Sequence, residues 1–550
     1  MSQYDELDLP RTSAEYVQRY EDDGAWGDET ILDHLDRAAA DHPDASLVGP
    51  NREVRFEELK PEVDRVSAGF QELGVSKGDV VSYQLPNRVD TIVVHLALSR
   101  LGAVANPIIP IYRHSEVEYI LNDAGSEVVV VPGAGDFDFP GMIEDVAPDC
   151  PALETMVVLG DGPERVDADV EMRPYDSLQA ASADDLDAPA VDANDVHALI
   201  YTSGTTSDPK GVLHTHNTLL YEERAVATLL GLTDETTVFM ASPITHITGV
   251  VYALEMPFLS GMDLVVMGEW DPERAVGLID EHRCNFTVAA TPFLQGIHDA
   301  APADWDNSLR VFGCGGADVP PDLVRKASDK LNCTVQRVYG STEYPTATWP
   351  PLDAPLEKLA ETDGSPAPGV RMKVVDIETG EELPPGETGE ILVDGPEMMI
   401  GYAADELNDD AFEGDWFRTG DLGQLDADGY LEVTGRKKDI IVRGGENIPV
   451  KEVEDRLYEH PAVADVAVVA MPDEDLQEKG CAYVQVAEGE AFTFEDMTEW
   501  LDSQQIAKQK YPERLEVVDG FPQTASGKIQ KADLRERIAE KLGMDPVTRG

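Results

Sequence analysis

Val80-Val-Ser-Tyr-Gln-Leu begins an alternation of short apolar runs and helical periodicity that decides the fold. The next stretch, Val89-Asp-Thr-Ile-Val-Val-His-Leu-Ala-Leu-Ser-Arg-Leu, predicts a helix that ends at Gly102, and residues 116–122 predict another. Glu127-Val-Val-Val-Val then predicts a buried strand. Strands that alternate with helices predict an α/β protein with largely parallel sheets and functional loops at the carboxyl ends of the strands.

The pattern changes twice in the second half of the chain. Residues 370–433 contain short strands separated by glycine and proline, which predict a small antiparallel or barrel-like region with a hairpin at 425–433. After Gly435-Arg-Lys-Lys-Asp, a segment richer in lysine predicts a small domain of its own. Its expected elements are strands at 463–470, 481–486 and 515–518 and helices near 494–503 and 532–542.

The net charge excludes several classes of function. The 550 residues include 42 Lys and Arg against 107 Asp and Glu, a formal charge of −65. Long-range repulsion therefore opposes binding to nucleic acids and to anionic membrane surfaces. The acid is spread along the chain, which favours a charged folded surface adapted to a salt-rich cytoplasm, where salt screens the self-repulsion. An ordinary acidic protein is the alternative, although −65 exceeds what solubility requires.

Other sequence features favour a soluble cytoplasmic protein. The five cysteines are far apart and form no CxxC pair, so neither a disulfide framework nor a cysteine zinc site is expected. The N-terminal residues lack the pattern of an export signal. No apolar run approaches the roughly 18 residues that a membrane span needs.

The strongest chemical signal is Leu199-Ile-Tyr-Thr-Ser-Gly-Thr-Thr-Ser-Asp-Pro-Lys-Gly-Val-Leu. An apolar strand is expected to lead into a loop that suits oxyanions. Gly204 lets the backbone approach a ligand, and Lys210 adds a mobile charge for a polyphosphate. The loop hydroxyls that can donate are those of Thr202, Ser203, Thr205, Thr206 and Ser207. The spacing is not that of a Walker A loop, and a polar turn that caps the next helix is the alternative.

A second strand leads into Val335-Gln-Arg-Val-Tyr-Gly-Ser-Thr-Glu-Tyr. Tyr339 is suited to stacking on a base and Thr342 to donating to a phosphate. Glu343 is suited to holding Mg²⁺ against phosphate oxygens. A tyrosine-glycine turn before an ordinary helix start is the alternative.

Five motifs together resemble the acyl- and aryl-CoA synthetases of the adenylate-forming superfamily. They occur in the order found in that superfamily: Tyr201–Gly211, Tyr339–Glu343, Arg418-Thr-Gly-Asp, Gly435-Arg-Lys-Lys-Asp and Thr524-Ala-Ser-Gly-Lys. The resemblance covers residues 30–542. It implies a large N-terminal domain, residues 1–434, with two α/β sheets and a small β-barrel-like region. A small mobile α+β C-terminal domain, residues 435–550, would follow, with its hinge at Lys438.

The resemblance also implies which residues bind ATP and Mg²⁺. Glu343 is the implied Mg²⁺ ligand and Thr342 the α-phosphate contact. The stretch from Thr202 to Lys210 is implied to hold the β- and γ-phosphates. The implied contacts around adenine are Gly315, Gly316, Ala317, Tyr339 and Gly340.

For the ribose, the resemblance implies Asp421, with Arg436 as a second ribose or phosphate contact. A carboxylate can accept hydrogen bonds from two vicinal hydroxyls, and a guanidinium suits oxyanions. Taken alone, Asp421 would be interpreted as a helix or turn cap and Arg436 as part of a linker salt bridge.

Three further sites are implied for the chemistry and for CoA. Lys528 matches the lysine that neutralises the carboxylate and the α-phosphate during adenylation, and an exposed turn lysine is the alternative. Gly444 and Gly445 would leave room for the pantetheine arm of CoA, with an ordinary β-turn as the alternative. His246 would lie beside the carboxylate pocket, although a lone histidine is often a core residue.

The activity implied by the resemblance is that of an ATP-dependent acyl-CoA synthetase with ATP, Mg²⁺, CoA and a carboxylic acid as ligands. Asn106-Pro-Ile-Ile-Pro-Ile-Tyr-Arg and Lys510-Tyr-Pro-Glu-Arg-Leu-Glu-Val-Val look most like cyclohexanecarboxylate and medium-chain acyl-CoA ligases, and an aromatic acid is also compatible. Ser207 departs from the glycine of most relatives. Two alternatives remain open: a ligase that loads a carrier protein, and a catalytically silent regulator that binds a nucleotide or CoA.

The charge generates a first prediction. ATP, pyrophosphate, a carboxylate and CoA are all anions, so the excess negative charge is expected on the outer surface. The folded state and the carboxylate-dependent release of pyrophosphate should both be lost at low KCl and retained at high KCl, because screening weakens surface repulsion. Circular dichroism and a pyrophosphate assay over a KCl series would measure this. Full activity in dilute buffer would contradict salt adaptation.

Overall fold

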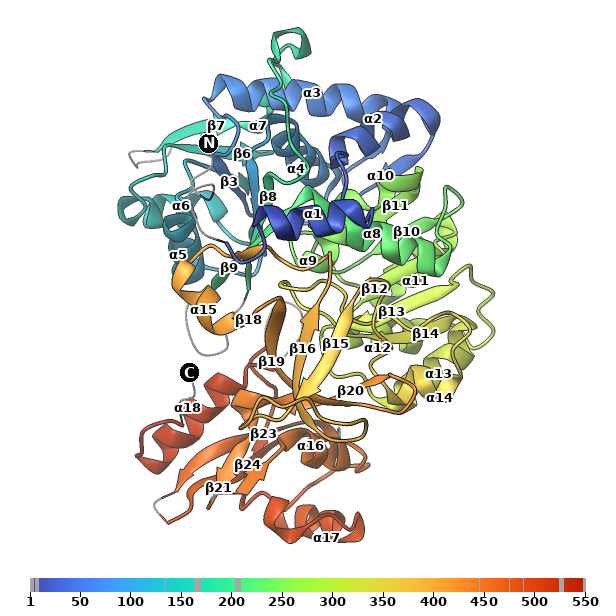
Figure 1. The fold of residues 1–550 in the computed structure, drawn as a ribbon, viewed down its shortest axis with the longest axis vertical. Coiled ribbons are helices and arrows are strands. Elements are labelled where there is room, and N and C mark those ends of the chain that lie inside the picture. Colours follow the sequence, from blue (N-terminus) through green and yellow to red (C-terminus); the bar gives the residue numbers. More distant parts are fainter. Residues whose placement is uncertain are drawn as a thin grey trace. The chain divides into compact units, whose positions relative to one another are not determined.

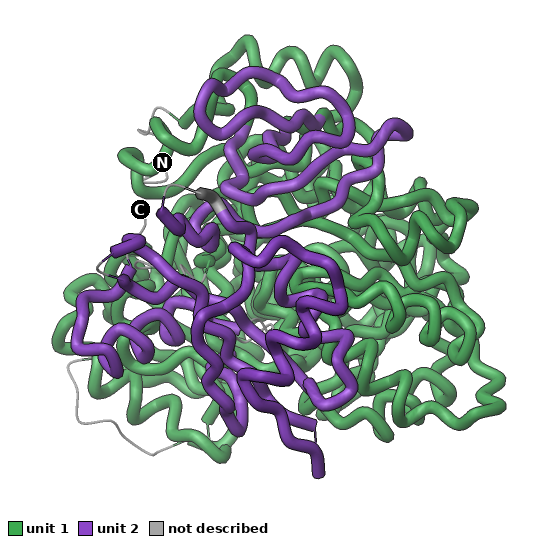
Figure 2. The backbone as a smooth tube through the Cα atoms, turned by 90° about the horizontal axis from the view of Figure 1, so that it is seen from below, with its two compact units in different colours: residues 1–203, 208–371, 394–416 green, residues 204–207, 372–393, 417–550 purple. Residues whose placement is uncertain are grey.

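The computed structural model describes residues 4, 9–133, 135–162, 170–202, 209–444, 446–473, 475–487, 489–523 and 529–547. Two compact units are distinguished in Figure 2: unit 1 is residues 1–203, 208–371 and 394–416, and unit 2 is residues 204–207, 372–393 and 417–550. Unit 2 thus includes residues 417–434 as well as the segment that follows them. The single domain boundary expected at Gly435 stays a prediction.

The first sheet of unit 1 contains the alternation that decides the fold (Figure 1). β3 (Val80–Tyr83) and β5 (Val128–Pro132) are parallel neighbours. α4 (Val89–Leu101) ends at Gly102, whose φ of 62° favours glycine, and α5 is His114–Ala124. The predicted elements are therefore confirmed. The sheet has eight strands, in the order β17 (Gly401–Tyr402), β9 (Lys210–Thr215), β8 (Val196–Thr202), β4 (Val104–Pro107), β3, β5, β6 (Thr155–Leu159) and β7 (Glu171–Pro174).

One end of this sheet is antiparallel. β8 and β9 pair in opposite directions, with Thr202 opposite Lys210, and β17 pairs antiparallel with β9. The stretch between Thr202 and Lys210 therefore connects two paired strands. The next helix, α8 (His216–Leu230), starts only after β9 and is capped by Thr215. The alternative in which this stretch caps the next helix is wrong.

The second sheet of unit 1 has seven strands and is parallel except for its edge strand β2. In β13 and β14, Gly315 is opposite Val338, so the carboxyl ends of these strands lie at the same edge. The strand order is β14 (Thr334–Val338), β13 (Val311–Gly315), β12 (Phe286–Ala289), β10 (Thr237–Met240), β11 (Asp263–Val266), β1 (Ser46–Val48) and β2 (Glu53–Arg55).

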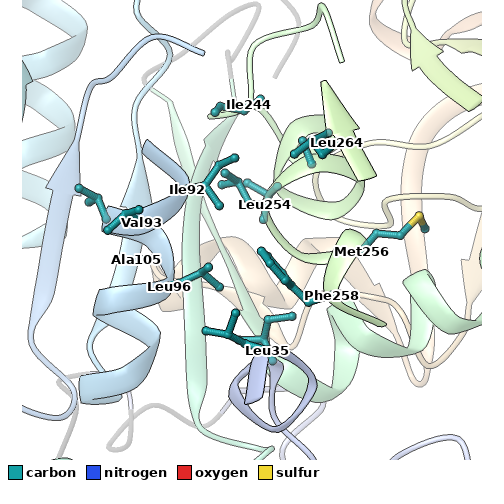
Figure 3. Packing of buried hydrophobic residues seen from close by; sticks show 14 of the residues in the cluster. Leu35, Ile92, Val93, Leu96, Ala105, Ile244, Leu254, Met256, Phe258 and Leu264 are labelled. Carbon is teal, nitrogen blue, oxygen red and sulfur yellow. The ribbon is translucent and has the colours of Figure 1, made fainter. Parts of the chain in front are cut away.

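A hydrophobic core joins the two sheets of unit 1. Ile92 and Leu96 of α4 lie in the same cluster as Leu254 and Phe258, and all four are buried (Figure 3). The described α- and π-helices of unit 1 not named so far are α1 (Ala14–Asp22), α2 (Ile31–Asp41), α3 (Phe56–Glu72), α6 (Phe139–Val146), α7 (Tyr175–Gln179), α9 (Ile247–Gly249), the π-helix η3 (Val250–Glu255), α10 (Pro257–Ser260), α11 (Pro272–His282), α12 (Thr291–Ala300), α13 (Pro321–Leu331), α14 (Leu356–Glu361) and α15 (Asn408–Ala411).

Unit 2 contains the antiparallel strands predicted between residues 370 and 433. β19 (Trp416–Leu425) and β20 (Leu431–Arg436) form the predicted hairpin, and β19 pairs antiparallel with β16 (Gly389–Asp394), which neighbours β15 (Arg371–Val375). A second sheet carries helices and its own core. The elements predicted after Gly435 are confirmed as β23 (Val463–Asp473), β24 (Gln477–Val486), α17 (Phe494–Ser503), β25 (Arg514–Val518) and α18 (Lys531–Leu542). The structure adds three elements that were not predicted: β21 (Ile441–Arg443), β22 (Glu446–Ile448) and α16 (Val450–Tyr458).

The cysteines and the acidic residues are distributed largely as expected. All five cysteines are buried and free. Within the described part of the chain, no helix is both long and apolar enough to cross a membrane. Nine of the described Asp and Glu side chains are buried, so most of the acid lies nearer the surface. The buried ones are Glu62, Asp90, Glu222, Glu223, Glu255, Glu390, Asp394, Glu397 and Asp421.

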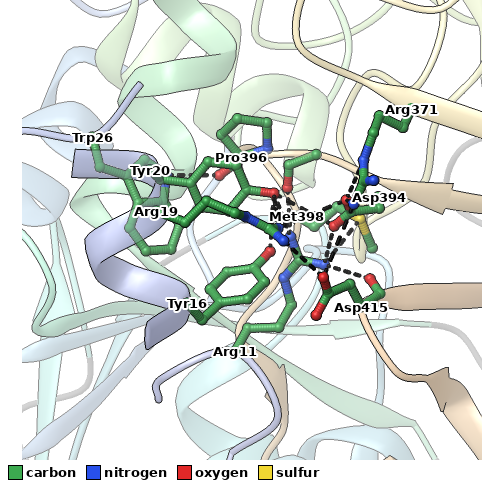
Figure 4. Close-up of polar contacts among 11 residues, drawn as sticks. Arg11, Tyr16, Arg19, Tyr20, Trp26, Arg371, Asp394, Pro396, Met398 and Asp415 are labelled. Atoms are coloured by element: carbon green, nitrogen blue, oxygen red, sulfur yellow. Dashed lines mark hydrogen bonds and ion pairs between the residues drawn. The ribbon is translucent and has the colours of Figure 1, made fainter. Parts of the chain in front are cut away.

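A buried ion pair fixes the N-terminal segment within unit 1. Arg11 Nη1 donates to Asp394 Oδ1 at 3.1 Å, Arg11 Nη2 donates to the Gly395 carbonyl at 2.6 Å, and both charged side chains are 1% exposed. The guanidinium of Arg11 also lies over the ring of Tyr16 (Figure 4). Arg19, at the edge of this cluster, approaches Asp394 only to 3.8 Å and is 36% exposed. The buried pair therefore connects the start of the chain to residues 394–395.

Arg11→Gln should lower the free energy of unfolding by roughly 1–3 kcal/mol, because it removes hydrogen bonds made by a buried charge, whereas Asp394 keeps its ion pair with Arg371. Arg19→Gln is the matched control and should cost less than about 1 kcal/mol, because an exposed ion pair is screened by water. Urea unfolding of both variants at one KCl concentration, followed by circular dichroism, would measure the difference. Equal losses in the two variants would contradict this account of the cluster.

Candidate active site

The candidate residues of the seven-stranded sheet follow the carboxyl ends of its strands. Because β13 and β14 are parallel neighbours in register, Gly315–Ala317 and Tyr339–Glu343 leave the sheet at the same edge. His246 follows β10 of this sheet. It caps α9, where its Nδ1 accepts a hydrogen bond from the backbone N–H of Thr248 at 3.4 Å.

Two glycines allow the backbone in these loops to pack closely. A Cβ atom at Gly340 would lie 2.0 Å from the carbonyl oxygen of Pro345, and one at Gly315 would lie 2.4 Å from that of Val338. Any side chain at either position would force the backbone to move. Beside Gly340, the hydroxyls of Tyr339 and Tyr344 are hydrogen-bonded at 2.8 Å. The chain turns tightly here, and its aromatic side chains are held in place.

Glu343 is oriented by two hydroxyl groups. Its Oε1 accepts a hydrogen bond from the Tyr402 hydroxyl at 2.9 Å, and its Oε2 accepts one from Ser341 Oγ at 2.6 Å. Burial and the neighbouring carboxylate raise the pKa of Tyr402, which keeps its hydroxyl protonated as a donor. A carboxylate has about four acceptor positions, so lone pairs remain for a cation. An oriented oxygen ligand of this kind fits Mg²⁺.

Lys210 contacts the same tyrosine. Its ammonium nitrogen lies 5.3 Å from the centroid of the Tyr402 ring, a distance typical of a cation–π interaction. Tyr402 reaches this place because β17 pairs with β9, where Tyr402 is opposite Val212. Tyr402 therefore contacts both Lys210 and Glu343. Sequence reasoning missed Tyr402, because no spacing relates it to either motif.

Thr342 is positioned by a buried histidine that sequence reasoning also missed. His214 Nε2 donates to the Thr342 carbonyl at 2.8 Å, and His214 Nδ1 is 3.0 Å from Thr218 Oγ1. Burial lowers the pKa of His214 to about 4, so the imidazole is neutral at physiological pH. A neutral imidazole has one donor and one acceptor nitrogen, which matches these two contacts. His214 thus ties β9 to the loop that carries Thr342 and Glu343.

The candidates of unit 2 form a second group. Asp421 and Arg436 are opposite each other in the pairing of β19 and β20, and Asp421 Oδ1 lies 3.0 Å from Arg436 Nε. Burial and the charge of Arg436 lower the pKa of Lys438 to about 8. Gly444 lies in the turn between β21 and β22 with a φ of 59°. This conformation favours glycine.

Several predicted site residues lie outside the described part of the chain. They are Ser203, Gly204, Thr205, Thr206, Ser207, Gly445 and Lys528. Their roles stay predictions.

Comparisons with known proteins agree with the order of the motifs. The family model of the AMP-binding enzymes matches residues 35–403, and that of the AMP-binding enzyme C-terminal domain matches residues 452–528. The medium-chain fatty-acid–CoA ligase of Escherichia coli is 35% identical, over 96% of this chain and 93% of the relative. The 2,3-dihydroxybenzoate-AMP ligase of Bacillus subtilis is 34% identical, over 96% and 97%.

Comparison with solved structures also shows similarity over nearly the whole chain. The o-succinylbenzoate coenzyme A synthetase of Bacillus subtilis, solved in complex with ATP and magnesium ion, superimposes with a TM-score of 0.81 at 27% identity, over 92% of this chain and 100% of that one. The likeness therefore extends over both units and is not confined to single motifs. The chain belongs to the AMP-binding enzyme family and is an adenylate-forming ligase.

Proposed function

We propose that the protein is an ATP-dependent acyl-CoA synthetase. The observation that supports the proposal is that Lys210 and Glu343 both contact Tyr402, because a cation suited to phosphate then lies near a carboxylate suited to Mg²⁺. The 35% identity to a medium-chain fatty-acid–CoA ligase supports CoA as the final acceptor. In the proposed reaction, a carboxylic acid, ATP and CoA give an acyl-CoA, AMP and pyrophosphate.

In the first step, the substrate carboxylate attacks the α-phosphorus of ATP, and pyrophosphate leaves. Lys210 and the hydroxyls from Thr202 onward hold the β- and γ-phosphates, while Thr342 contacts the α-phosphate. Tyr339 and Gly340, together with Gly315–Ala317, surround adenine. Glu343 holds Mg²⁺, which when bound neutralises charge on the phosphate oxygens. Binding and orientation of the two reacting anions account for the catalysis, and no protein nucleophile is needed.

In the second step, the CoA thiol attacks the acyl carbonyl carbon, and AMP leaves. Asp421 and Arg436 bind the ribose. Lys528 belongs to the first step, to which it supplies a positive charge. Gly444 and Gly445 leave room for pantetheine, and Lys438 acts at the hinge. The lowered pKa of Lys438 gives this residue a change of charge near pH 8. His246 lies on the side of the carboxylic acid, which we propose to be a medium-chain, alicyclic or aromatic acid.

Loading of a carrier protein is the second candidate function. The 34% identical relative is named as a 2,3-dihydroxybenzoate-AMP ligase, a name that contains no CoA. Both functions share the first step and differ only in the thiol that accepts the acyl group. The acceptor therefore decides between them.

The acceptor can be tested directly. Straight-chain, alicyclic and aromatic acids are each incubated with the protein and MgATP at high KCl, and pyrophosphate release identifies the acid. For that acid, thioester formation is then measured with free CoA and with a phosphopantetheinylated carrier protein. We expect thioester with free CoA at micromolar to millimolar concentration. Thioester with the carrier alone would favour the second function, and no pyrophosphate with any acid would contradict both.

Lys528→Ala should separate the two steps. The first step brings two anions together and needs the cation, so carboxylate-dependent pyrophosphate release should fall by roughly 10²–10³-fold. Attack of CoA on preformed acyl-adenylate should change little. Lys541→Ala is the matched control, because Lys541 lies on α18 and its charge pairs with Glu516. Equal loss in both half-reactions of the Lys528 variant would contradict the assigned role.

A further inference from the structure

The core of unit 1 contains a group of ionisable side chains that the proposed function does not use. His95 comes from α4, His197 from β8, and Glu255 from the end of the π-helix η3. The Nε2 atom of each histidine lies 2.9 Å from Glu255 Oε1. The three potential ligand atoms lie within 4.8 Å of one another, and no side chain of the three is more than 1% exposed.

A second carboxyl group lies beside this cluster. The side chain of Glu223, on α8, is hydrogen-bonded to that of Glu255, and both side chains are buried. No other described residue donates a hydrogen bond to Glu255 Oε2 or to the carboxyl oxygens of Glu223. Two buried carboxyl groups in contact are costly unless they share a proton or a cation binds to them. The cluster therefore contains two carboxyl groups that can share a proton or bind a cation.

The ring of His95 is also oriented by a contact at its other nitrogen. His95 Nδ1 lies 2.9 Å from the hydroxyl of Tyr83, which is completely buried. A histidine that binds a metal through one nitrogen commonly donates a hydrogen bond from the other, and this contact fixes the ring.

We propose that His95, His197 and Glu255 bind one divalent transition-metal ion, with Zn²⁺ preferred. Two imidazoles and a carboxylate suit Zn²⁺ and its first-row neighbours, whereas Mg²⁺ and Ca²⁺ prefer oxygen ligands alone. Ligand atoms around tetrahedral Zn²⁺ lie about 3.3 Å apart. The two 2.9 Å contacts therefore need to widen by a few tenths of an ångström, and the two histidine nitrogens, which lie within 4.8 Å of each other, need to reach the same spacing. Glu223 or Glu255 Oε2 supplies the fourth ligand. Two carboxylates and one dication are together neutral.

Such a metal ion would be structural, because every ligand is buried between the two sheets of unit 1. It would hold α4, β8 and η3 together. His197 is the second residue of β8, and Thr202 at the end of the same strand starts the phosphate-binding stretch. On η3, the Tyr252 hydroxyl lies 2.8 Å from Thr346 Oγ1, three residues after Glu343. π-helical turns are frequent at functional sites, and this one would position a metal ligand.

The test is the metal content of the full-length protein. Untagged protein, produced with Zn²⁺, Mn²⁺, Fe²⁺, Co²⁺ and Ni²⁺ in the medium and purified without chelator, is analysed by mass spectrometry for metals. We expect about one transition-metal ion per chain in the parent protein and less than about one tenth in His95→Gln and Glu255→Gln. His34→Gln is the matched control, a buried histidine on α2 outside the cluster, and should keep the full amount.

A second measurement covers variants that fail to fold. The parent protein is unfolded with a chelator, then refolded with Co²⁺ or without metal. Refolding with Co²⁺ should give the visible absorption of tetrahedral Co²⁺ and a higher melting temperature than refolding without it. A metal-free parent protein that refolds without either change would overturn the proposal. So would metal that is retained in both His95→Gln and Glu255→Gln. Neither readout requires catalytic activity.

Discussion

The antiparallel pairing of β8 with β9, and of β9 with β17, is the constraint on which the rest of the candidate site depends. It places Thr202 opposite Lys210, the two residues that flank the stretch proposed to bind phosphate. It carries Tyr402 to Lys210 and Glu343, and His214 to the Thr342 carbonyl. The backbone ladder thus fixes the spacing of groups that come from three distant parts of the chain. Their chemistry depends on this spacing, because oriented charges act on developing charge without reorganisation.

The acidic composition makes the position of each cation important. A chain with 107 acidic residues binds anions only where a positive side chain is kept available or where carboxylates are neutralised. In unit 1, the buried carboxylates are neutralised or hydrogen-bonded in different ways. Asp394 is paired with Arg11, and Glu222 accepts a hydrogen bond from Tyr252. Glu255 Oε1 lies 2.9 Å from the Nε2 atoms of two histidines. For Glu223 and Glu397, burial raises the pKa and so favours the neutral carboxyl group.

Sequence reasoning predicted those parts of the structure that depend on local pattern. The strand at 80–83, the helix that ends at Gly102 and the hairpin at 425–433 all follow from hydrophobic period and glycine positions. Functional loops were expected at the carboxyl ends of parallel strands, and the pairing of β13 with β14 places the ends of these two strands at one edge. Residues 203–208 and 528 were predicted from motifs alone, and they lie outside the described residues.

The remaining contacts could not be predicted, because they depend on pairing between distant segments. Tyr402 is 59 residues from Glu343 and has an ordinary local sequence. His95, His197 and Glu255 each occur singly within an apolar stretch, where a lone polar residue gives no sign of a partner. Asp421 and Arg436 had been interpreted through resemblance, and only the strand register shows that they face each other. A site whose residues come from distant segments gives no recognisable pattern in any one of those segments.

Residues 394–416 belong to unit 1, although residues 372–393 before them belong to unit 2. This order affects the folding of the nascent chain on the ribosome. Arg11 is synthesised early, but its partner Asp394 follows 383 residues later. Until that segment emerges, the buried guanidinium has no carboxylate, β9 has no β17 beside it, and Lys210 and Glu343 lack Tyr402. A nascent chain that stops before residue 394 is therefore an unfinished unit 1 with exposed strand edges. Completion of unit 1 is a late event in translation, although most of its residues are made first.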